Sequence, residues 1–291
     1  QGYSVDDPTH ATVIGGEAYK GTNIKTIDLT GIEYIGDNAF SSCPYITSVT
    51  IPDTVLAMGN GVFADSGLKD IVFNSFFTKV PNSVCSNTKV SLVKFTNVGY
   101  ITEIGSSAFA NCILTDYPAD LSKSKNPIII GESAFEGNAQ IKSLTIPDNV
   151  LRLDASAFSE CTGLKTLKFG ANMVSMDKQS FEGCTALTDI TFNDKLSSIG
   201  GSAFNGCTSL VEVNGLPETL VDWVEVTSSE GYGFGNAIFA NCTSLKSITL
   251  PDSLTKIPEQ LCYGDTSLTR TTIGKGINTV KLSQVVQTCR H

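Results

Sequence analysis

Apolar residues recur along this chain at fixed offsets from a repeated Ala-Phe pair. After Phe135 they stand at Ile141, Leu144, Ile146, Val150, Leu153 and Ala157, and the next aromatic residue is Phe158. Apolar and polar residues alternate from Leu144 to Ile146, which predicts a short strand with one buried face. Proline follows this strand at Pro52, Pro147 and Pro251. Because proline has no N–H to continue a ladder, we expect the strand to end there. Ile-Gly pairs such as Ile35-Gly36 and Ile199-Gly200 predict a second corner.

The aromatic residue of the Ala-Phe pair, which we call the anchor, recurs through most of the chain. Equivalent positions are Tyr19, Phe40, Phe63, Cys85, Phe109, Phe135, Phe158, Phe181, Phe204, Phe239 and Cys262. Their separations are 21, 23, 22, 24, 26, 23, 23, 23, 35 and 23 residues, and three consecutive intervals of 23 exclude a chance pattern. A unit of this length cannot bury its own apolar face, so the units must stack and share a core. The sequence therefore predicts a solenoid of eleven rungs, roughly 50 Å long at ~4.8 Å per rung.

The recurring string Leu-x-x-Leu-x-Ile-Pro-x-x-Val-x-x-Ile-Gly-x-x-Ala-Phe-x-x-Cys resembles the BspA-like leucine-rich repeats, a class also named after treponemes. The resemblance runs from about Val13 to Val280. It implies an α/β-type leucine-rich-repeat solenoid that is mostly β. We expect a parallel sheet with one short strand per rung, and short 3₁₀ or irregular turns on the opposite side.

The same repeats define the expected domain organisation. We expect one solenoid domain over residues 1–291, with an irregular N-terminal edge at 1–12 and a degenerate C-terminal rung at about 273–291. Insertions interrupt the repeat at about 113–127 and 221–236. Because the matching residues are the ones expected in the core, the resemblance defines the fold and does not name the partner.

Six of the nine cysteines share one repeat position, three residues after the anchor: Cys43, Cys112, Cys161, Cys184, Cys207 and Cys242. Cys85 and Cys262 replace the anchor itself, where a small apolar residue fits. Four rungs in line would spread their sulfur atoms over ~14 Å, whereas zinc needs four ligands at ~2.3 Å from one centre. A disulfide between adjacent rungs is harder to exclude, although its parallel Cβ atoms would have to be drawn together. The favoured interpretation is a buried column of reduced thiols, with Cys289 as the expected exposed thiol.

Composition and charge narrow the possible partners. Hydrophobic residues make up 41% and charged residues 17% of the chain, which is typical of a soluble globular protein. No apolar run approaches the ~18 residues of a transmembrane segment. The net charge is −9 and Lys and Arg are not clustered, so no nucleic acid partner is expected. The sequence starts at Gln1 without a secretion signal, so its N-terminus does not indicate a location.

Few residues are suited to catalysis. The two histidines, His10 and His291, stand near opposite ends of the expected rod, so no Ser-His-Asp or Cys-His arrangement can form at the central rungs. Asp189 and Glu212 would stand on neighbouring rungs, and two acids ~5 to 9 Å apart could hydrolyse a glycosidic bond. Solvated face residues are the favoured interpretation. We therefore expect no enzyme activity, no catalytic residue, no metal and no cofactor.

The outward face of the strands is the expected binding surface. Each rung exposes two positions there, most of them short, polar and rich in hydroxyl groups. In the central rungs these candidates are Thr166, Lys168, Asp189, Thr191, Glu212 and Asn214. An ordinary solvated sheet face has the same pattern, so the pattern alone does not decide between the two.

The second candidate for binding is the insertion at 221–236, which makes its interval twelve residues longer than 23. It contains the only tryptophan, Trp223, together with Tyr232 and Phe234. Insertions in repeat proteins often lie on the binding face, so we expect at least one of these aromatic residues to be exposed beside Glu212 and Asn214. The glycines around Tyr232 and Phe234 would permit close backbone approach. The alternative is that the aromatic residues fold back and shield the flank of the rod.

Three functions agree with these observations. The first is a non-enzymatic surface or secreted module that recognises a protein or glycan on a host or microbial surface, as the resemblance to adhesins implies. The second is a glycan-active enzyme with carboxylates on the strand face, and the third is a structural spacer in a longer surface protein. The resemblance also implies a bacterial protein with an extracellular or cell-surface location.

Overall fold

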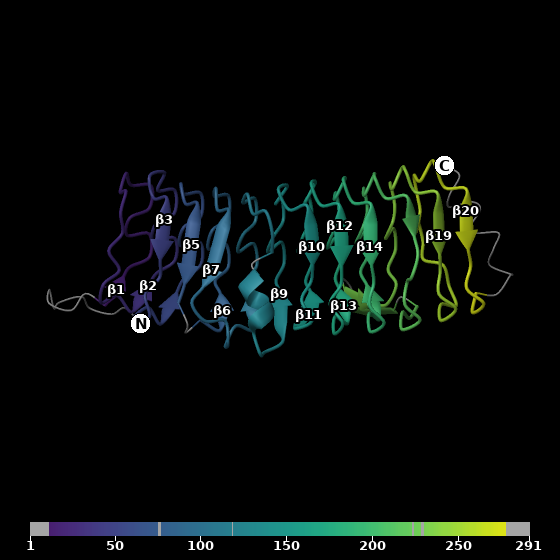
Figure 1. The fold of residues 1–291 in the computed structure, drawn as a ribbon, viewed down its shortest axis with the longest axis horizontal. Helices are drawn as coiled ribbons and strands as arrows, with labels where there is room; N and C mark the ends of the chain where they lie inside the picture. Colours follow the sequence, from purple (N-terminus) through teal and green to yellow (C-terminus); the bar gives the residue numbers. More distant parts are fainter. Residues whose placement is uncertain (1–11, 75–76, 118, 223, 228–229, 278–291) are drawn as a thin grey trace.

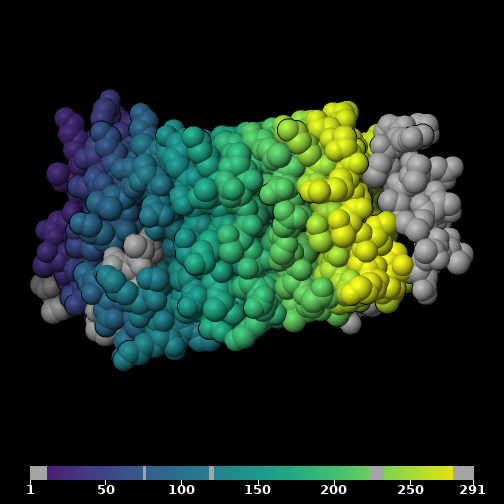
Figure 2. All heavy atoms as spheres, turned by 45° about the vertical axis from the view of Figure 1, so that its right-hand side comes forward, coloured from purple at the N-terminus to yellow at the C-terminus, as the bar shows by residue number. Residues whose placement is uncertain are grey.

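The computed structural model describes residues 12–74, 77–117, 119–222, 224–227 and 230–277. Its rungs follow one another along a rod, with two rows of short strands on its surface (Figure 1). The space-filling view shows successive rungs packed directly against one another (Figure 2). The predicted solenoid of about eleven turns is therefore confirmed.

The first sheet contains the predicted strands. They are β3 (Ser48–Thr50), β5 (Asp70–Phe73), β7 (Leu92–Phe95), β10 (Ser143–Thr145), β12 (Thr166–Lys168), β14 (Asp189–Thr191), β16 (Glu212–Val213), β19 (Ser247–Thr249) and β20 (Arg270–Thr272). They pair in parallel within three segments, β3-β5-β7, β10-β12-β14 and β16-β19-β20. The register aligns equivalent repeat positions, as in Thr166↔Asp189 and Lys168↔Thr191. In β3, β10 and β12 the central residue is accordingly buried and its two neighbours are exposed.

A second sheet runs along the rod, where the sequence predicted only a corner. Its strands are β1 (Val13–Ile14), β2 (Tyr34–Ile35), β4 (Ala57–Met58), β6 (Lys79–Val80), β8 (Glu103–Ile104), β9 (Ile128–Ile130), β11 (Val150–Leu153), β13 (Ser175–Met176) and β15 (Ser198–Ile199). These strands are mostly two residues long, too short for alternation to be visible in one repeat. The expectation of one strand per rung is therefore corrected to two in most rungs.

Each rung turns sharply around its anchor on the remaining side. In all eleven rungs the residues two positions before and after the anchor have positive φ, as do Gln179 (φ 59) and Gly183 (φ 71) around Phe181. The N–H groups of these three residues donate to carbonyl oxygens of the next rung at 2.8 to 3.0 Å. These hydrogen bonds offset the cost of left-handed backbone in residues other than glycine. The anchor turns thus form a third ladder between the rungs.

The core is a stack of equivalent side chains. Anchor rings of adjacent rungs lie parallel, with centroids 5.0 to 5.7 Å apart. Phe181 is fully buried between Phe158 and Phe204. Parallel stacking of this kind adds to the stabilisation from apolar burial.

The two insertions take different forms. The first contains the 3₁₀ helix η1 (Ala119–Lys123) in place of a first-sheet strand between β7 and β10. The second forms an antiparallel hairpin of β17 (Val224–Thr227) and β18 (Glu230–Tyr232). The hairpin follows Asp222 and ends before Phe234, and both Asp222 and Ile199 form parallel bridges with Phe234. Its base therefore belongs to the second sheet.

Phe234 is fully buried, so it is not the exposed aromatic residue expected in this insertion. The N–H of Gly235 donates to the carbonyl oxygen of Ile199 at 2.8 Å, which places Phe234-Gly235 above Ile199-Gly200. Phe234 and Ile199 each stand five residues before the anchor of their rung. At this corner the first residue of the pair faces the core. The flanking glycines have a structural role, because a Cβ atom on Gly235 would lie 2.5 Å from the backbone nitrogen of Gly201.

Candidate binding surface

The cysteine column lies in the core and not at a surface site. All eight cysteines of the described ranges are buried, and none of them forms a disulfide bond. The thiol of Cys207 donates to the anchor carbonyl of the previous rung, Phe181 O, at 3.4 Å, and Cys161, Cys184 and Cys242 make the equivalent bond at 3.3 to 3.4 Å. Burial raises the pKa of Cys161 and Cys207 to about 12. These thiols are therefore protonated at neutral pH and serve as core hydrogen-bond donors; Cys289 lies outside the described residues.

The predicted strand-face residues lie where the sequence analysis placed them. Thr166, Lys168, Asp189, Thr191, Glu212 and Asn214 are all exposed on the outer side of the first sheet. The hydroxyl of Thr166 donates to that of Ser143 at 2.7 Å, and the hydroxyl of Thr249 to Asn214 Oδ1 at 3.3 Å. The face is therefore a row of short polar groups, some of which are already linked from rung to rung.

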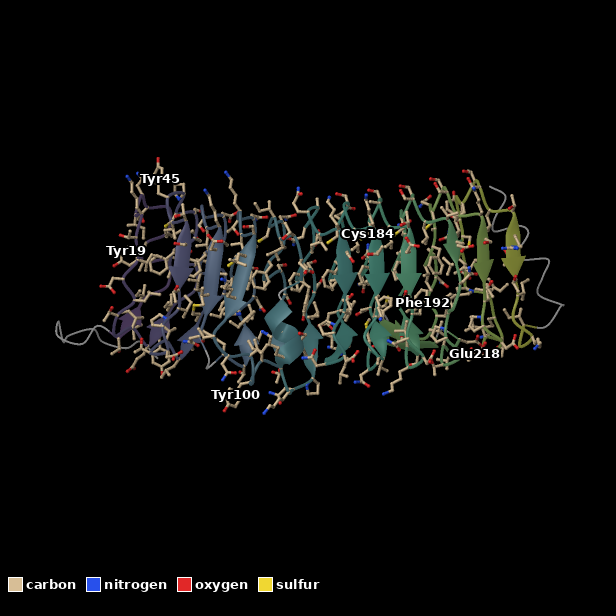
Figure 3. All side chains as sticks on the ribbon, in the orientation of Figure 1. Tyr19, Tyr45, Tyr100, Cys184, Phe192 and Glu218 are labelled. Carbon is tan, nitrogen blue, oxygen red and sulfur yellow. The ribbon has the colours of Figure 1, made fainter. Side chains whose placement is uncertain are left out.

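A groove of about 890 Å³ adjoins this face where β10, β12 and β14 end. Residues at equivalent positions of three successive rungs line it, so it runs along the axis of the rod. They include Thr145 to Asn149, Lys168 to Ala171 and Thr191 to Lys195, with Ser122 of η1 at one end. Phe192 lies at this end of the strands, whereas Cys184 precedes β14 (Figure 3). The sequence analysis identified Lys168 and Thr191 and missed the rest of the groove.

The groove results from departures from the repeat. Pro147 is followed in the next two rungs by Gly170 and Asn193, and a Cβ atom on Gly170 would lie 2.5 Å from Pro147 O. Phe192 is half-buried, and the next rung has Gly215 at its position. A Cβ atom added to Gly215 would meet nothing within 4 Å. The next rung therefore has no side chain at this position to cover Phe192, which lines the groove.

Neighbouring side chains fix the position of the Phe192 ring. It stacks on the buried Phe169 ring at 5.8 Å between centroids and meets the Phe204 ring edge-on at 6.3 Å. The Asn193 side chain holds the turn beside it, because its amide donates to Gly170 O at 2.7 Å and to Met173 O at 3.1 Å. The floor of the groove is therefore rigid and preformed.

The charged residues of the groove balance one another. Asp148 and Asp194 carry negative charge, and Lys168 and Lys195 carry positive charge. Lys195 Nζ donates to Asn172 Oδ1 at 2.6 Å, and Asp148 Oδ1 accepts the Ala171 N–H at 2.7 Å. Within the described ranges, the Lys168 ammonium and the Thr145 and Thr191 hydroxyl groups have no hydrogen-bond partner. These three groups are available to a ligand.

Of the three aromatic side chains of the insertion, only that of Phe234 can be placed relative to this surface. Trp223 lies outside the described residues, Tyr232 ends β18, and Phe234 is in the core. The hairpin base pairs with the second sheet, whereas Glu212 and Asn214 belong to the first-sheet rung. The structure therefore does not bring Phe234 together with these two polar residues.

Of the four residues considered for catalysis, only Asp189 and Glu212 lie in the described part of the chain. His10 and His291 lie outside the described residues. Asp189 and Glu212 belong to β14 and β16, which are in different hydrogen-bonded segments. The pKa is raised by burial at Asp154, which follows β11, and at Asp265, which lies in the cysteine column. Neither of these two carboxyl groups belongs to the first-sheet face or lines the groove. Among the described residues, no helix is long and apolar enough to cross a membrane.

Stacked rungs, a leucine-rich core and a polar parallel sheet define a leucine-rich repeat solenoid. The BspA type leucine-rich repeat region matches the chain in six copies, over residues 3–118, 119–223 and 224–289, and the chain belongs to this family. The search of curated proteins gave no match.

Two solved structures show the same fold. A leucine-rich repeat protein from Bacteroides ovatus is 23% identical, with a TM-score of 0.71 over 96% of this chain and 73% of that one. A leucine-rich cell surface protein from Faecalibacterium prausnitzii is also 23% identical, with a TM-score of 0.56 over 94% of this chain and 78% of that one. At this identity the likeness establishes the fold alone.

Proposed function

We propose that this protein is a non-enzymatic recognition module at a bacterial cell surface, which binds its ligand through the first-sheet face from β10 to β16 and the adjoining groove. The observation that carries the proposal is the groove itself, whose exposed rim continues directly into the strand face. Its volume of about 890 Å³ lies within the range of ligand sites, about 300–1,000 Å³. The family membership and the cell surface protein with the same fold support the location.

Recognition is favoured over catalysis by the electrostatics of the surface. The carboxyl groups whose pKa is raised, Asp154 and Asp265, stand away from the face and the groove. A general acid at neutral pH requires such a shift at the reacting centre. The face presents hydroxyl, amide, ammonium and carboxylate groups on the strands of a sheet, which suits binding.

The proposal is tested by changing one pair of face residues and a matched pair. Thr166 and Asp189 are cross-strand partners on β12 and β14, and Ser48 and Asp70 are the equivalent partners on β3 and β5. We expect the purified chain to bind on an array of glycans and matrix proteins, and the combined variant Thr166→Glu, Asp189→Lys to lose that binding. The matched variant Ser48→Glu, Asp70→Lys should bind as the wild type does. An array without a saturable ligand, or equal binding by both variants, would contradict the proposal.

A further inference from the structure

We propose that the groove binds a neutral, extended, β-linked oligosaccharide, with the Phe192 ring stacking against a sugar ring. This inference rests on the recognition function proposed above and assigns the chemical class of the ligand. It is carried by three features of the groove: an open aromatic ring, a balanced set of polar groups, and a period set by the rungs.

Phe192 supplies an apolar platform at a fixed position. Phe169 supports the ring from one rung, and the next rung has Gly215 at this position, with no side chain to cover the ring. The C–H groups on one side of a pyranose ring form an apolar surface that packs on an aromatic ring, and aromatic residues dominate binding energy when they are preorganised. A flexible apolar side chain at this position would not offer a flat surface.

The polar groups around Phe192 fit a ligand with many hydroxyl groups and no charge. The lysines and aspartates of the groove sum to zero, so a strongly acidic or basic ligand would gain little from the site. A sugar hydroxyl both donates and accepts hydrogen bonds. Lys168 can donate to it, Asp194 can accept from it, and the hydroxyl groups of Thr145 and Thr191 can do either.

The positions that line the groove recur along the axis with the period of the rungs, although the side chains at these positions differ. Neighbouring strands of a parallel sheet lie ~4.8 Å apart, which is close to the length of one β-linked hexose unit in an extended chain. Three rungs therefore offer three equivalent positions to successive sugar units. An added peptide strand would need a free sheet edge, and β12, the central strand of the groove, has none because it pairs with β10 and β14.

The test uses calorimetric titration of the full chain with three hexasaccharides. We expect β-1,4-linked glucose or N-acetylglucosamine hexamers to bind, and the α-1,4-linked glucose hexamer, which coils, to bind at least tenfold more weakly. Lys168→Ala and Phe192→Leu should each weaken binding by on the order of tenfold. Lys94→Ala is the matched control, because Lys94 is exposed on β7 as Lys168 is on β12, and it should leave binding unchanged. If Phe192→Leu does not fold, Asp194→Asn on the exposed rim replaces it.

The outcomes separate this inference from the proposed function. Equal binding of α- and β-linked hexamers, or binding that survives both groove variants, would overturn the groove assignment. Suppose that no hexasaccharide binds, but that the Thr166→Glu, Asp189→Lys variant loses binding to another ligand on the array. The recognition function then stands, and the proposed ligand class is wrong. If no sugar binds and Lys168→Ala abolishes binding to a protein on the array, the groove recognises a protein and the oligosaccharide assignment is wrong.

Discussion

At the position three residues after the anchor, most side chains donate a hydrogen bond to a backbone carbonyl oxygen of an anchor residue. A cysteine donates its thiol hydrogen to the anchor carbonyl of the previous rung, as Cys207 does to Phe181 O. Asn138 is long enough to donate to the anchor carbonyls of two rungs, Phe109 O at 2.8 Å and Phe135 O at 2.9 Å. Because a buried carbonyl without a partner costs about 1–3 kcal/mol, this position selects donors that fit a narrow space.

Asp265 stands at the same position and is the exception. Burial raises its pKa to about 7, and hydrogen bonds from the Cys242 N–H and the Cys262 side chain offset part of the shift. An unfolded aspartate has a pKa of about 3.9, so between these values the folded protein holds a proton that the unfolded chain has released. Stability therefore falls as pH rises from about 4 to 7, and it stays lower above pH 7.

We predict that Asp265→Asn stabilises the protein by about 1–3 kcal/mol at pH 8, because asparagine is neutral and can donate as Asn138 does. Urea unfolding at pH 8 and pH 4.5 should show the gain at the higher pH and a smaller gain at the lower one. The reciprocal change, Asn138→Asp, should destabilise most at pH 8. A gain for Asp265→Asn that is independent of pH would show that the carboxyl group is solvated.

At the scale of the elements, the corners of the second sheet set how closely the rungs approach. A Cβ atom on Gly200 would lie 2.3 Å from Lys178 N, and one on Gly235 would lie 2.5 Å from Gly201 N. Both contacts are with backbone atoms of an adjacent rung, which cannot move aside without breaking ladder hydrogen bonds. The glycine is therefore required by packing between rungs.

Gly235→Ala should destabilise the protein by about 1–3 kcal/mol, because the rungs must separate to admit the methyl group. Gly15→Ala is the control, since a Cβ atom there meets nothing within 4 Å, and it should change stability by less than about 0.5 kcal/mol. Thermal or urea unfolding of the two variants makes the comparison. Equal effects would show that the hairpin rung is loosely packed.

The elements also show which features the sequence could predict. The first-sheet strands follow from alternation within one repeat, and Pro147 marks the end of a strand as expected. Phe234 is a candidate for the exposed aromatic residue because it lies within the insertion, but its spacing predicts burial. Counted backward from Phe239, Phe234-Gly235 has the spacing of Ile199-Gly200 from Phe204. The exposure of Phe192 could not be read from its own repeat, since it depends on Gly215 in the next one.

At the scale of the whole molecule, stability is distributed over interfaces between neighbouring rungs. The central anchors stack on both sides, as Phe181 does on Phe158 and Phe204. Tyr19 stacks on Phe40 and remains 43% exposed. In a solenoid stabilised by contacts between neighbouring rungs, a substitution in one rung destabilises mainly the adjacent rungs.

Phe181→Ala should cost about 3–5 kcal/mol, because it removes a buried ring from two stacks. Hydrogen exchange measured by mass spectrometry should rise most over residues 158–204 and little at either end of the rod. Tyr19→Ala should cost less, because its ring is partly solvated. Uniform loosening of the whole chain after Phe181→Ala would mean that the rungs unfold as one cooperative unit.

The third ladder at the anchor turns has a mechanical consequence. Hydrogen bonds of the two sheets and of the anchor turns join each rung to the next at several places around its circumference. In the part of the chain that the structure describes, no backbone hydrogen bond joins a rung to a more distant one. If the two ends of the chain were pulled apart, the terminal rung would peel away while the rest kept its shape. Each such event would release about 23 residues, or roughly 80 Å of extended chain at ~3.5 Å per residue. A tether built in this way lengthens in equal steps and absorbs a pull without losing its remaining rungs.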